Sequence, residues 1–279
     1  ELKDKPEVVL SFNESAAPVG ARARLEKMSL SGTPKLPQKA EYFWSDTDAK
    51  ALEAVSGLFH AGMSVHYLYK ALSSGAFGVK KNRKLVPTRW AITSVDSQLS
   101  EFLVEKKIKS FKEIESVEVY AESFLGNHFF VVFVPREWGF EMLETWLPGA
   151  GWAAFAEKKE FHIIADHEEY DGRKAYASNI TGAYYAARLP VAEHLVQKKR
   201  QASVFVFREI DETYNIGLGV WVIRETVKKA LEKKPQLFSS LSQAFSFISP
   251  RLQVPFNLYE KTSSLMGKLR FQSRLSDFF

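Results

Sequence analysis

The sequence predicts an α+β fold, with a mixed sheet of four or more strands covered by helices and an extended tail at the C-terminus. Four short runs rich in β-branched and aromatic residues lie between residues 116 and 208 and are typical of strands. Longer stretches with helical spacing of their apolar residues precede, separate and follow these runs. The 279 residues are 46% hydrophobic and 25% charged, which is the composition of an ordinary globular chain able to bury a full core.

We expect three parts along the chain. Residues 1–45 contain four prolines with scattered serines and glycines, which predicts an irregular segment packed on the core, with one short strand at residues 7–12. Residues 46–269 are expected to form the α+β core domain, and residues 270–279 form the tail. No internal repeat with the period of a solenoid is present.

The first part of the core is expected to be helical. Polar residues at 45–48 supply N-cap candidates for a helix over residues 46–72, which a Ser-Ser-Gly sequence then ends. Gly57 and Gly62 weaken the middle of this helix. A basic loop follows, and the next helix is expected over residues 94–106.

The pattern then changes to strands. An alternating segment from residue 117 and an uninterrupted apolar run over residues 129–134 predict two strands, the second buried on both faces. Gly126-Asn127 lies between them and predicts the turn of a hairpin. Further strands are expected at residues 161–165 and 202–208. Further helices are expected at residues 181–201, where Pro190 must start, kink or divide the helix, and at 220–233, 237–248 and 258–269.

The sequence excludes several classes of protein. Its longest apolar run, residues 129–134, is far shorter than the roughly 20 residues of a membrane-spanning helix. The charged N-terminus shows no signal peptide, and the absence of cysteine excludes disulfides and cysteine-ligated metals. We therefore assign no metal site and expect a cytoplasmic location. Because residue 1 is Glu rather than Met, we expect that an N-terminal piece is missing.

Basic and aromatic residues suggest where a nucleic acid or nucleotide binds. Five basic residues and no acidic one lie between residues 79 and 90, in a chain of net charge +5. Arginine forks match phosphate geometry and Trp rings can stack on bases, so such residues could form a cleft for single-stranded DNA or a nucleotide. The candidates are Arg83, Lys84, Arg89, Trp90, Arg136, Trp138, Arg188, Trp221 and Arg224. The alternative is that the loop is merely solvated, the Trp rings are in the core and the arginines form structural pairs with acidic residues.

Weaker candidates exist for acid–base or metal chemistry. The acidic cluster at residues 166–171 follows a predicted strand and could hold Mg²⁺, although such a loop is more often only solvated. A histidine at the start of a strand could act as a general base or be a hydrogen-bonded structural residue. Other acidic residues, Glu209 among them, could orient the arginine side chains. The acid–base candidates are Asp96, His128, Asp166 and Glu225. No phosphate-binding loop and no serine-hydrolase elbow occurs.

The strongest signal lies in the last eight residues. Two consecutive phenylalanines at the end of the chain have no following residues with which to build a core, and termini tend to fray. Leu275 and Phe278 are three residues apart, so a 3₁₀ turn would place them on one side, with Phe279 beside them and Gln272 one turn earlier. This Gln-x-x-Leu-x-x-Phe-Phe pattern resembles the motif by which replication and repair proteins bind the sliding clamp, PCNA. The alternative is that the phenylalanines fold back onto the domain.

Three internal stretches are similar to the archaeal Nre family of DNA repair proteins: residues 83–96, 182–189 and 219–225. The resemblance extends from about residue 72 to the C-terminus. It implies a role in the DNA damage response, cooperation with nucleotide excision repair and a clamp-binding C-terminus, but no settled reaction or cofactor. Members usually carry an N-terminal cysteine-containing, zinc-binding module, so this cysteine-free chain departs from the family there and fits a truncated or divergent member.

We therefore expect a DNA repair protein that is recruited to PCNA by Gln272, Leu275, Phe278 and Phe279. It would hold DNA or a nucleotide in a basic cleft lined by Arg and Trp side chains. Two alternatives stay open: an enzyme that acts on a nucleotide or a nucleic-acid phosphodiester, and a non-catalytic adaptor between the clamp and repair proteins.

Overall fold

The computed structural model describes residues 11–13, 16–19, 36–150, 161–215 and 217–271. Residue contacts divide the chain into two compact units, Glu1–Gln98 (unit 1) and Leu99–Phe279 (unit 2), and each is described by itself. The predicted core domain over residues 46–269 spans both units and stays a prediction. Most of the predicted tail lies outside the described residues.

Unit 1 consists of short helices around a small apolar core. Its elements are β1 (Ser11–Asn13), β2 (Ala16–Val19), α1 (Gln38–Ser45), α2 (Ala51–His60), α3 (Val65–Ser73), the 3₁₀ turn η1 (Lys80–Asn82) and the first part of α4 (Thr88–Lys106). Val55, Leu58 and Leu68 are fully buried. The two short strands pair with each other, and β1 shares its first two residues with the predicted strand. Helix α1 lies in the stretch that the sequence predicted to be irregular, so that prediction is wrong there.

The helix predicted over residues 46–72 is in fact two helices. Gly62, just after α2, has a φ of +83°, a left-handed conformation that glycine adopts at little cost. Ser64 then caps α3, because its side-chain oxygen accepts a hydrogen bond from the backbone N–H of Tyr67 at 3.3 Å. The chain therefore turns between two helices at a glycine that the sequence had marked only as a weak point.

Unit 2 is built on a six-stranded mixed sheet, which confirms the predicted fold class. Its strands are β3 (Val117–Phe124), β4 (Asn127–Val134), β5 (Gly139–Trp146), β6 (His162–Glu168), β7 (Ser203–Ile210) and β8 (Gln236–Phe238). They lie in the order β6-β5-β7-β4-β3-β8. Only the β5–β7 pair is parallel.

Strands β3 and β4 form the predicted hairpin. Phe124 pairs with Asn127, so the turn contains only Leu125 and Gly126, one residue earlier than predicted. Both turn residues have positive φ, 47° and 68°, as a two-residue turn of type I′ requires. A Cβ on Gly126 would lie 2.7 Å from a carboxylate oxygen of Asp211, so the close approach of that loop also favours glycine.

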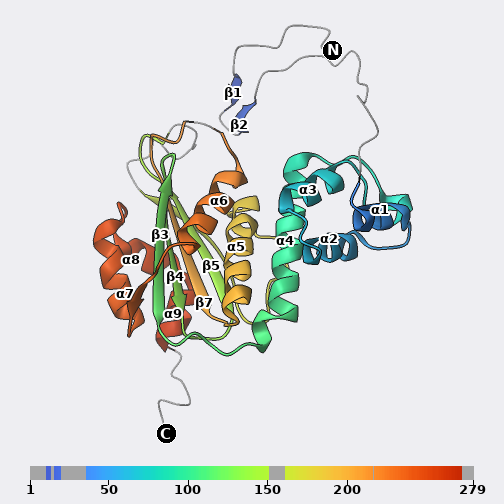
Figure 1. Cartoon of the computed structure of the whole chain (residues 1–279). Helices are drawn as coiled ribbons and strands as arrows, with labels where there is room; N and C mark the ends of the chain where they lie inside the picture. Colours follow the sequence, from blue (N-terminus) through green and yellow to red (C-terminus); the bar gives the residue numbers. More distant parts are fainter. Residues whose placement is uncertain (1–10, 14–15, 20–35, 151–160, 216, 272–279) are drawn as a thin grey trace. The chain divides into compact units, whose positions relative to one another are not determined.

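Helices cover both faces of the sheet (Figure 1). Helices α5 (Gly182–Lys198) and α6 (Val220–Leu231) pack on one face, and α7 (Leu241–Ile248), α8 (Phe256–Thr262) and α9 (Ser264–Phe271) pack on the other. Helix α5 is not divided at Pro190. The helix predicted over residues 237–248 is shorter, because β8 takes its first residues, and the helix predicted over 258–269 is two helices. Among the described residues, no helix combines the length and apolar character needed to cross a membrane.

Strand β5 was not predicted from the sequence. It carries Glu141 and Glu144, and charged residues inside an otherwise apolar run hide the pattern of a buried strand. Both glutamates are buried. Glu144 pairs with Arg208 of β7 at 2.5 Å, and Arg208 also donates to the side-chain oxygen of Asn127. The two glutamates are therefore buried structural residues of the sheet rather than surface charges.

Glu141 binds the start of α9 on the face of the sheet that is covered by α7, α8 and α9. Its carboxylate accepts hydrogen bonds from the backbone N–H of Ser264 at 2.8 Å and of Leu265 at 3.3 Å, and from the hydroxyl of Ser263. These groups lie at the start of α9, where backbone N–H groups have no partner within the helix. Burial raises the pKa of Glu141 to about 7, although these hydrogen bonds oppose the shift.

This pKa predicts a pH-dependent contribution to stability. Because the pKa of Glu141 is higher in the folded chain than in the unfolded one, the folded state binds the proton more tightly. Glu141 therefore contributes most below its unfolded pKa, and about 3 kcal/mol of that contribution is lost as the pH rises from the unfolded pKa of 4.5 to the folded pKa of about 7. Urea unfolding of wild-type and Glu141→Gln between about pH 5 and pH 8 should show a flatter pH dependence for the variant. Equal slopes would contradict the assignment.

Candidate nucleic-acid interface

Arg83 holds the basic loop of unit 1 in place. Its guanidinium donates from Nε to the carbonyl oxygen of Gly78 at 2.6 Å and from Nη1 to that of Trp44 at 2.6 Å. From Nη2 it donates to the carbonyl oxygens of Asp46 at 2.5 Å and Phe43 at 3.3 Å. A guanidinium whose donors bind four backbone carbonyls fastens the end of α1 to the loop. Arg83 is therefore structural here, in contrast to the phosphate-facing role predicted for it.

The rest of this loop is turned toward solvent. Helix α4 begins at Thr88, six residues earlier than predicted, because the carbonyl oxygen of Pro87 accepts from the N–H groups of Trp90 and Ala91 at 2.9 and 3.1 Å. The first turn of α4 thereby exposes Arg89 and Trp90. Trp90 is 59% exposed, so the alternative that it is a core residue is wrong.

Two further lysines of the predicted basic loop belong to this region, and one Trp that was not predicted adds to it. Lys80 and Lys81 lie in the exposed turn η1, whose first N–H donates to the carbonyl oxygen of Thr47 at 2.8 Å. Trp44, at the end of α1, is 58% exposed and contacts Arg83 through its carbonyl group. No sequence pattern pointed to Trp44, because it lies in the segment predicted to be irregular. We call the exposed set the basic–aromatic surface of unit 1: Trp44, Lys80, Lys81, Lys84, Arg89 and Trp90.

Arg188 belongs to the interior of unit 2. It is 5% exposed and forms an ion pair with Glu168 at 2.7 Å, and it donates to the hydroxyl of Ser100 at 2.9 Å. The indole N–H of buried Trp138 donates to the same Glu168 oxygen at 2.8 Å. A buried pair satisfied in this way contributes to the fold, so the phosphate-facing role predicted for Arg188 is wrong.

The third family stretch is partly buried. On α6, Arg224 is buried, Trp221 is half-buried and Glu225 is exposed. Helices α5 and α6 pack against each other, so the second and third stretches are neighbours within unit 2. Arg136 is half-buried in the turn after β4, and Asp96 is buried in α4 of unit 1. The convergence of all three stretches on one cleft stays a prediction.

Asp166 lies within β6 rather than in an acidic loop, which corrects the prediction. It is buried, and its carboxylate accepts from Arg173 at 3.1 Å and from the backbone N–H groups of Asn179 at 2.9 Å and Ile180 at 2.7 Å. These bonds fix the segment that leads into α5. Within the described ranges, no three His, Asp or Glu side chains are grouped as a metal ion would require.

His128 is placed between a hydroxyl and a carboxylate. Its Nε2 lies 2.7 Å from the Asp211 carboxylate, and its Nδ1 lies 2.9 Å from the hydroxyl of Ser123. Although partial burial opposes it, hydrogen bonds from His128 and Thr213 hold the pKa of Asp211 below its usual range. The arrangement can pass a proton between its members, and it equally fastens the β3–β4 hairpin to the loop after β7.

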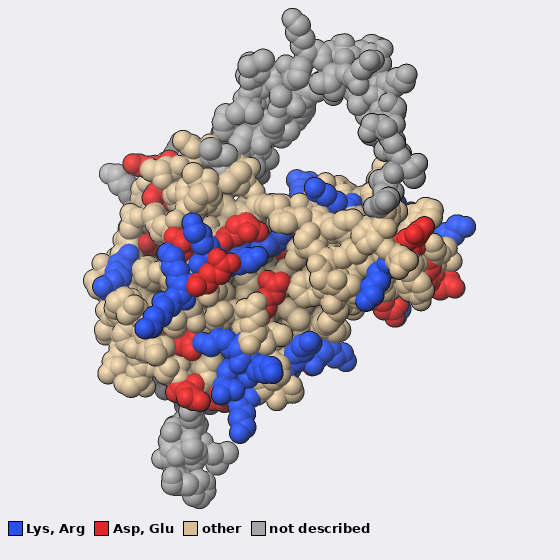
Figure 2. Space-filling model, in the orientation of Figure 1, with Lys and Arg blue, Asp and Glu red and all other residues tan. Residues whose placement is uncertain are grey.

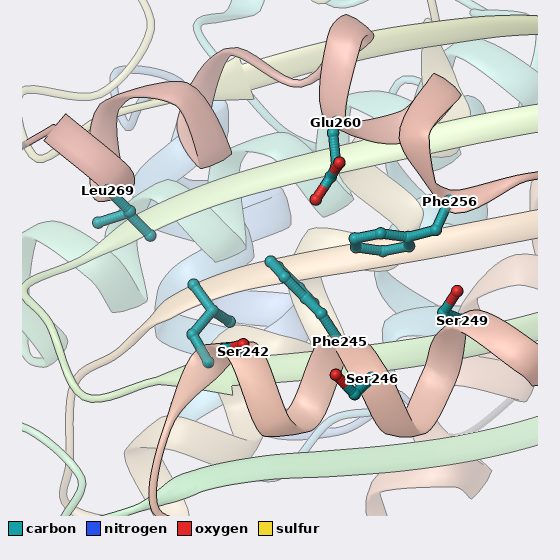
Figure 3. A pocket seen from close by; sticks show the side chains of 8 residues that line it. Ser242, Phe245, Ser246, Ser249, Phe256, Glu260 and Leu269 are labelled. Carbon is teal, nitrogen blue, oxygen red and sulfur yellow. The ribbon is translucent and has the colours of Figure 1, made fainter.

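A pocket of about 440 Å³ lies between α7, α8 and α9 (Figure 3). Phe245 and Phe256 present their rings to it, with the carboxylate of Glu260 close by. None of the described residues that line it is Lys or Arg, and the carboxylate of Glu260 repels phosphate, so this lining does not favour a nucleotide. The clamp-binding candidates Gln272, Leu275, Phe278 and Phe279 lie outside the described residues.

The structure defines an α+β protein that exposes a set of basic and aromatic side chains on unit 1. Two family models match the sequence: the N-terminal part of archaeal Nre over residues 1–153 and the C-terminal part over residues 168–278. The chain belongs to the archaeal Nre family. No solved structure matches it.

Relatives with assigned names agree with this membership. The chain is 41% identical over 242 residues to DNA repair protein NreA of Archaeoglobus fulgidus, covering 87% of this chain and 60% of the relative. It is 35% identical to DNA repair protein NreA of Haloferax volcanii, covering 99% of this chain and 66% of the relative. It is also 35% identical to DNA repair protein NreB of Archaeoglobus fulgidus, covering 95% and 66%. The chain thus spans about two thirds or less of the length of these relatives.

Arg83→Lys tests the fastening of the basic loop. A lysine ammonium cannot reproduce the guanidinium fork on four carbonyl groups, so we expect the free energy of unfolding to fall by about 2 kcal/mol. Urea denaturation measures this loss. Lys84→Ala, at the exposed neighbouring position, should change the value by less than about 0.5 kcal/mol. If the two variants are equally stable, Arg83 does not have the structural role that its contacts indicate.

Proposed function

We propose that this chain is a DNA repair protein that binds the sliding clamp, PCNA, through its C-terminal residues and contacts DNA through the basic–aromatic surface of unit 1. The C-terminal pattern carries the proposal: Gln272, Leu275, Phe278 and Phe279 match the spacing of clamp-binding motifs. Family membership supports it, because relatives at 35 to 41% identity are named DNA repair proteins. Nucleotide excision repair proteins are further partners that the family suggests.

The clamp contact follows from the chemistry of the pattern. Helix α9 ends at Phe271, so the pattern begins with the next residue of the chain. Aromatic side chains that fill a pocket on a partner contribute a large part of the binding energy of an interface, and the polar Gln272 would add a directed hydrogen bond. Leu275, Phe278 and Phe279 are thus the expected anchors, with the residues between them as spacers.

The DNA contact rests on exposed charges and rings. Lys80, Lys81, Lys84 and Arg89 are exposed and can neutralise backbone phosphates, while Trp44 and Trp90 present rings on which unpaired bases can stack. This combination favours single-stranded DNA as the ligand of the surface. The alternative function is a non-catalytic adaptor between the clamp and repair proteins, because an adaptor needs no cleft for DNA or a nucleotide.

Substitution of the terminal phenylalanines tests the clamp contact. In titration calorimetry of the chain against an archaeal sliding clamp, we expect Phe278→Ala with Phe279→Ala to weaken binding by about 100-fold, since each ring is an anchor. Ser273→Ala with Ser276→Ala, at spacer positions of the same segment, should leave the affinity within about threefold. Unchanged affinity of the phenylalanine variant would show that the clamp, if bound, is bound elsewhere.

Trp90→Ala tests the DNA contact. Loss of one stacked base should weaken binding to a labelled single-stranded oligonucleotide by about tenfold, measured by fluorescence anisotropy. Phe124→Ala removes another exposed ring, 48% exposed on β3 in unit 2, and should leave the affinity unchanged. Equal affinity of the two variants would exclude Trp90 from the DNA contact.

A further inference from the structure

A second group of basic side chains lies at one end of unit 2, where α4 and α5 finish. The segments at residues 106–114 and 198–201 are far apart in the sequence, but Gln201 joins them. Its N–H donates to the carbonyl oxygen of Lys112 at 2.9 Å, its side chain donates to that of Phe111 at 2.6 Å, and its own carbonyl accepts from Ile114 at 3.0 Å. Figure 2 shows Lys and Arg side chains gathered at this end of unit 2, in the lower part of the view.

The group carries more positive charge than its acidic neighbours neutralise. Its members are Lys106, Lys107, Lys109, Lys112, Lys198, Lys199 and Arg200, and we call it the α4–α5 patch. Three members have acidic partners: Lys109 with Glu105 at 2.5 Å, Lys198 with Glu118 at 2.6 Å and Arg200 with Glu115 at 3.7 Å. The other four form no ion pair with any described residue: Lys106, Lys107, Lys112 and Lys199.

Lys199 occupies a backbone conformation that does not favour lysine. Its φ and ψ are 53° and 47°, the left-handed region in which glycine commonly ends a helix. Among the described residues, only two others besides glycines have positive φ, Leu125 and Thr181. A basic side chain is therefore present where glycine would be less strained, and in the middle of other positive charges. Helix-end electrostatics favour a cation at this position, but they do not require four lysines that lack an ion pair with any described residue.

The surroundings of the patch indicate what it binds. Ile108 and Ile114 of the first segment are buried, and the second segment, residues 198–201, contains only Lys, Arg and Gln, so the patch offers little for insertion into a membrane. The ring of Tyr170 has the ammonium of Lys109 over it, 4.8 Å from its centre, so it is not open for stacking on a base. A positively charged patch that offers few exposed apolar or stacking groups is suited to bind the regularly spaced phosphates of a DNA duplex.

We propose that the α4–α5 patch binds the sugar–phosphate backbone of duplex DNA without reading its sequence. This site is additional to the basic–aromatic surface of unit 1, and it rests on the proposed role of the chain at DNA. The ligand of the patch is double-stranded, whereas the exposed Trp rings of unit 1 favour single strands.

The salt dependence of duplex binding tests the proposal. We expect the full chain with Lys106→Gln, Lys107→Gln and Lys112→Gln to bind a labelled duplex of about 20 base pairs at least tenfold more weakly, measured by fluorescence anisotropy. Between about 50 and 200 mM salt, the slope of log affinity against log salt should fall by about 2 to 3, because each lost phosphate contact removes about 0.9. The matched control, Lys228→Gln, Lys229→Gln and Lys234→Gln, makes the same change in net charge elsewhere and should retain the wild-type slope.

A second variant separates binding from stability. Lys199→Gly relieves the left-handed backbone, so its melting temperature should rise by a few degrees while duplex affinity falls about threefold. A purely structural lysine would leave duplex affinity unchanged on this substitution, which would overturn the proposal for Lys199.

Failure of this inference is distinguishable from failure of the proposed function. If duplex affinity is lost only when Lys80, Lys81 and Lys84 are replaced by Gln, the patch is not a DNA site but the unit 1 surface is. If the patch variant loses binding to anionic lipid vesicles and keeps duplex binding, the ligand is a lipid surface and the proposal is overturned. Clamp binding is measured without DNA, so its outcome is independent of both results.

Discussion

Strand β7 is buried along its whole length, and this constraint shapes the rest of unit 2. A charged side chain on a strand that is covered on both faces cannot reach solvent, yet β7 carries Arg208 and Glu209. Arg208 is satisfied by Glu144 and Asn127 on neighbouring strands. Glu209 lies on the other face and accepts from the backbone N–H groups of Gln253 and Val254 at 2.8 and 2.9 Å, and from the hydroxyl of Tyr259. Removing one member of such a pair would leave a buried charge without compensation.

These interior charges determine how the C-terminal helices attach to the sheet. Glu209 and Glu141 point to the same face, where they bind the backbone before α8 and at the start of α9. The same face carries an aromatic cluster in which Phe207 meets the ring of Tyr259 edge-on at 5.2 Å. Apolar packing therefore supplies the bulk of the attachment, and the two carboxylates determine which backbone groups meet the sheet.

The sequence predicted the elements whose patterns are local. The hairpin, the two later strands and helices α5 and α6 follow from apolar periodicity and turn residues. The sequence did not predict β5, because Glu141 and Glu144 face inward there. Asp166 was placed in a loop for the same reason. From sequence alone, a buried acidic residue cannot be distinguished from a solvated one when its partners are far away along the chain. Arg83 and Arg188 were assigned to phosphate, but backbone carbonyls and Glu168 bind them.

The sequence did not predict surfaces that are formed by segments far apart along the chain. The α4–α5 patch depends on Gln201 joining two stretches of lysines, and Trp44 depends on the contact of α1 with the basic loop. Of the three stretches that resemble the Nre family, residues 182–189 are buried throughout, so this stretch specifies the fold more than a binding surface. We therefore propose that DNA contacts exposed basic side chains of each unit and that the clamp contacts the last residues of the chain.

Because the proposed DNA surfaces and the proposed clamp-binding residues are different parts of the chain, we expect one molecule to bind clamp and DNA at the same time. Sedimentation velocity of the full chain with an archaeal sliding clamp and a duplex, each followed by its own absorbance label, tests this most directly. We expect one faster species that contains all three components. Displacement of the DNA from the chain when the clamp is added would contradict it.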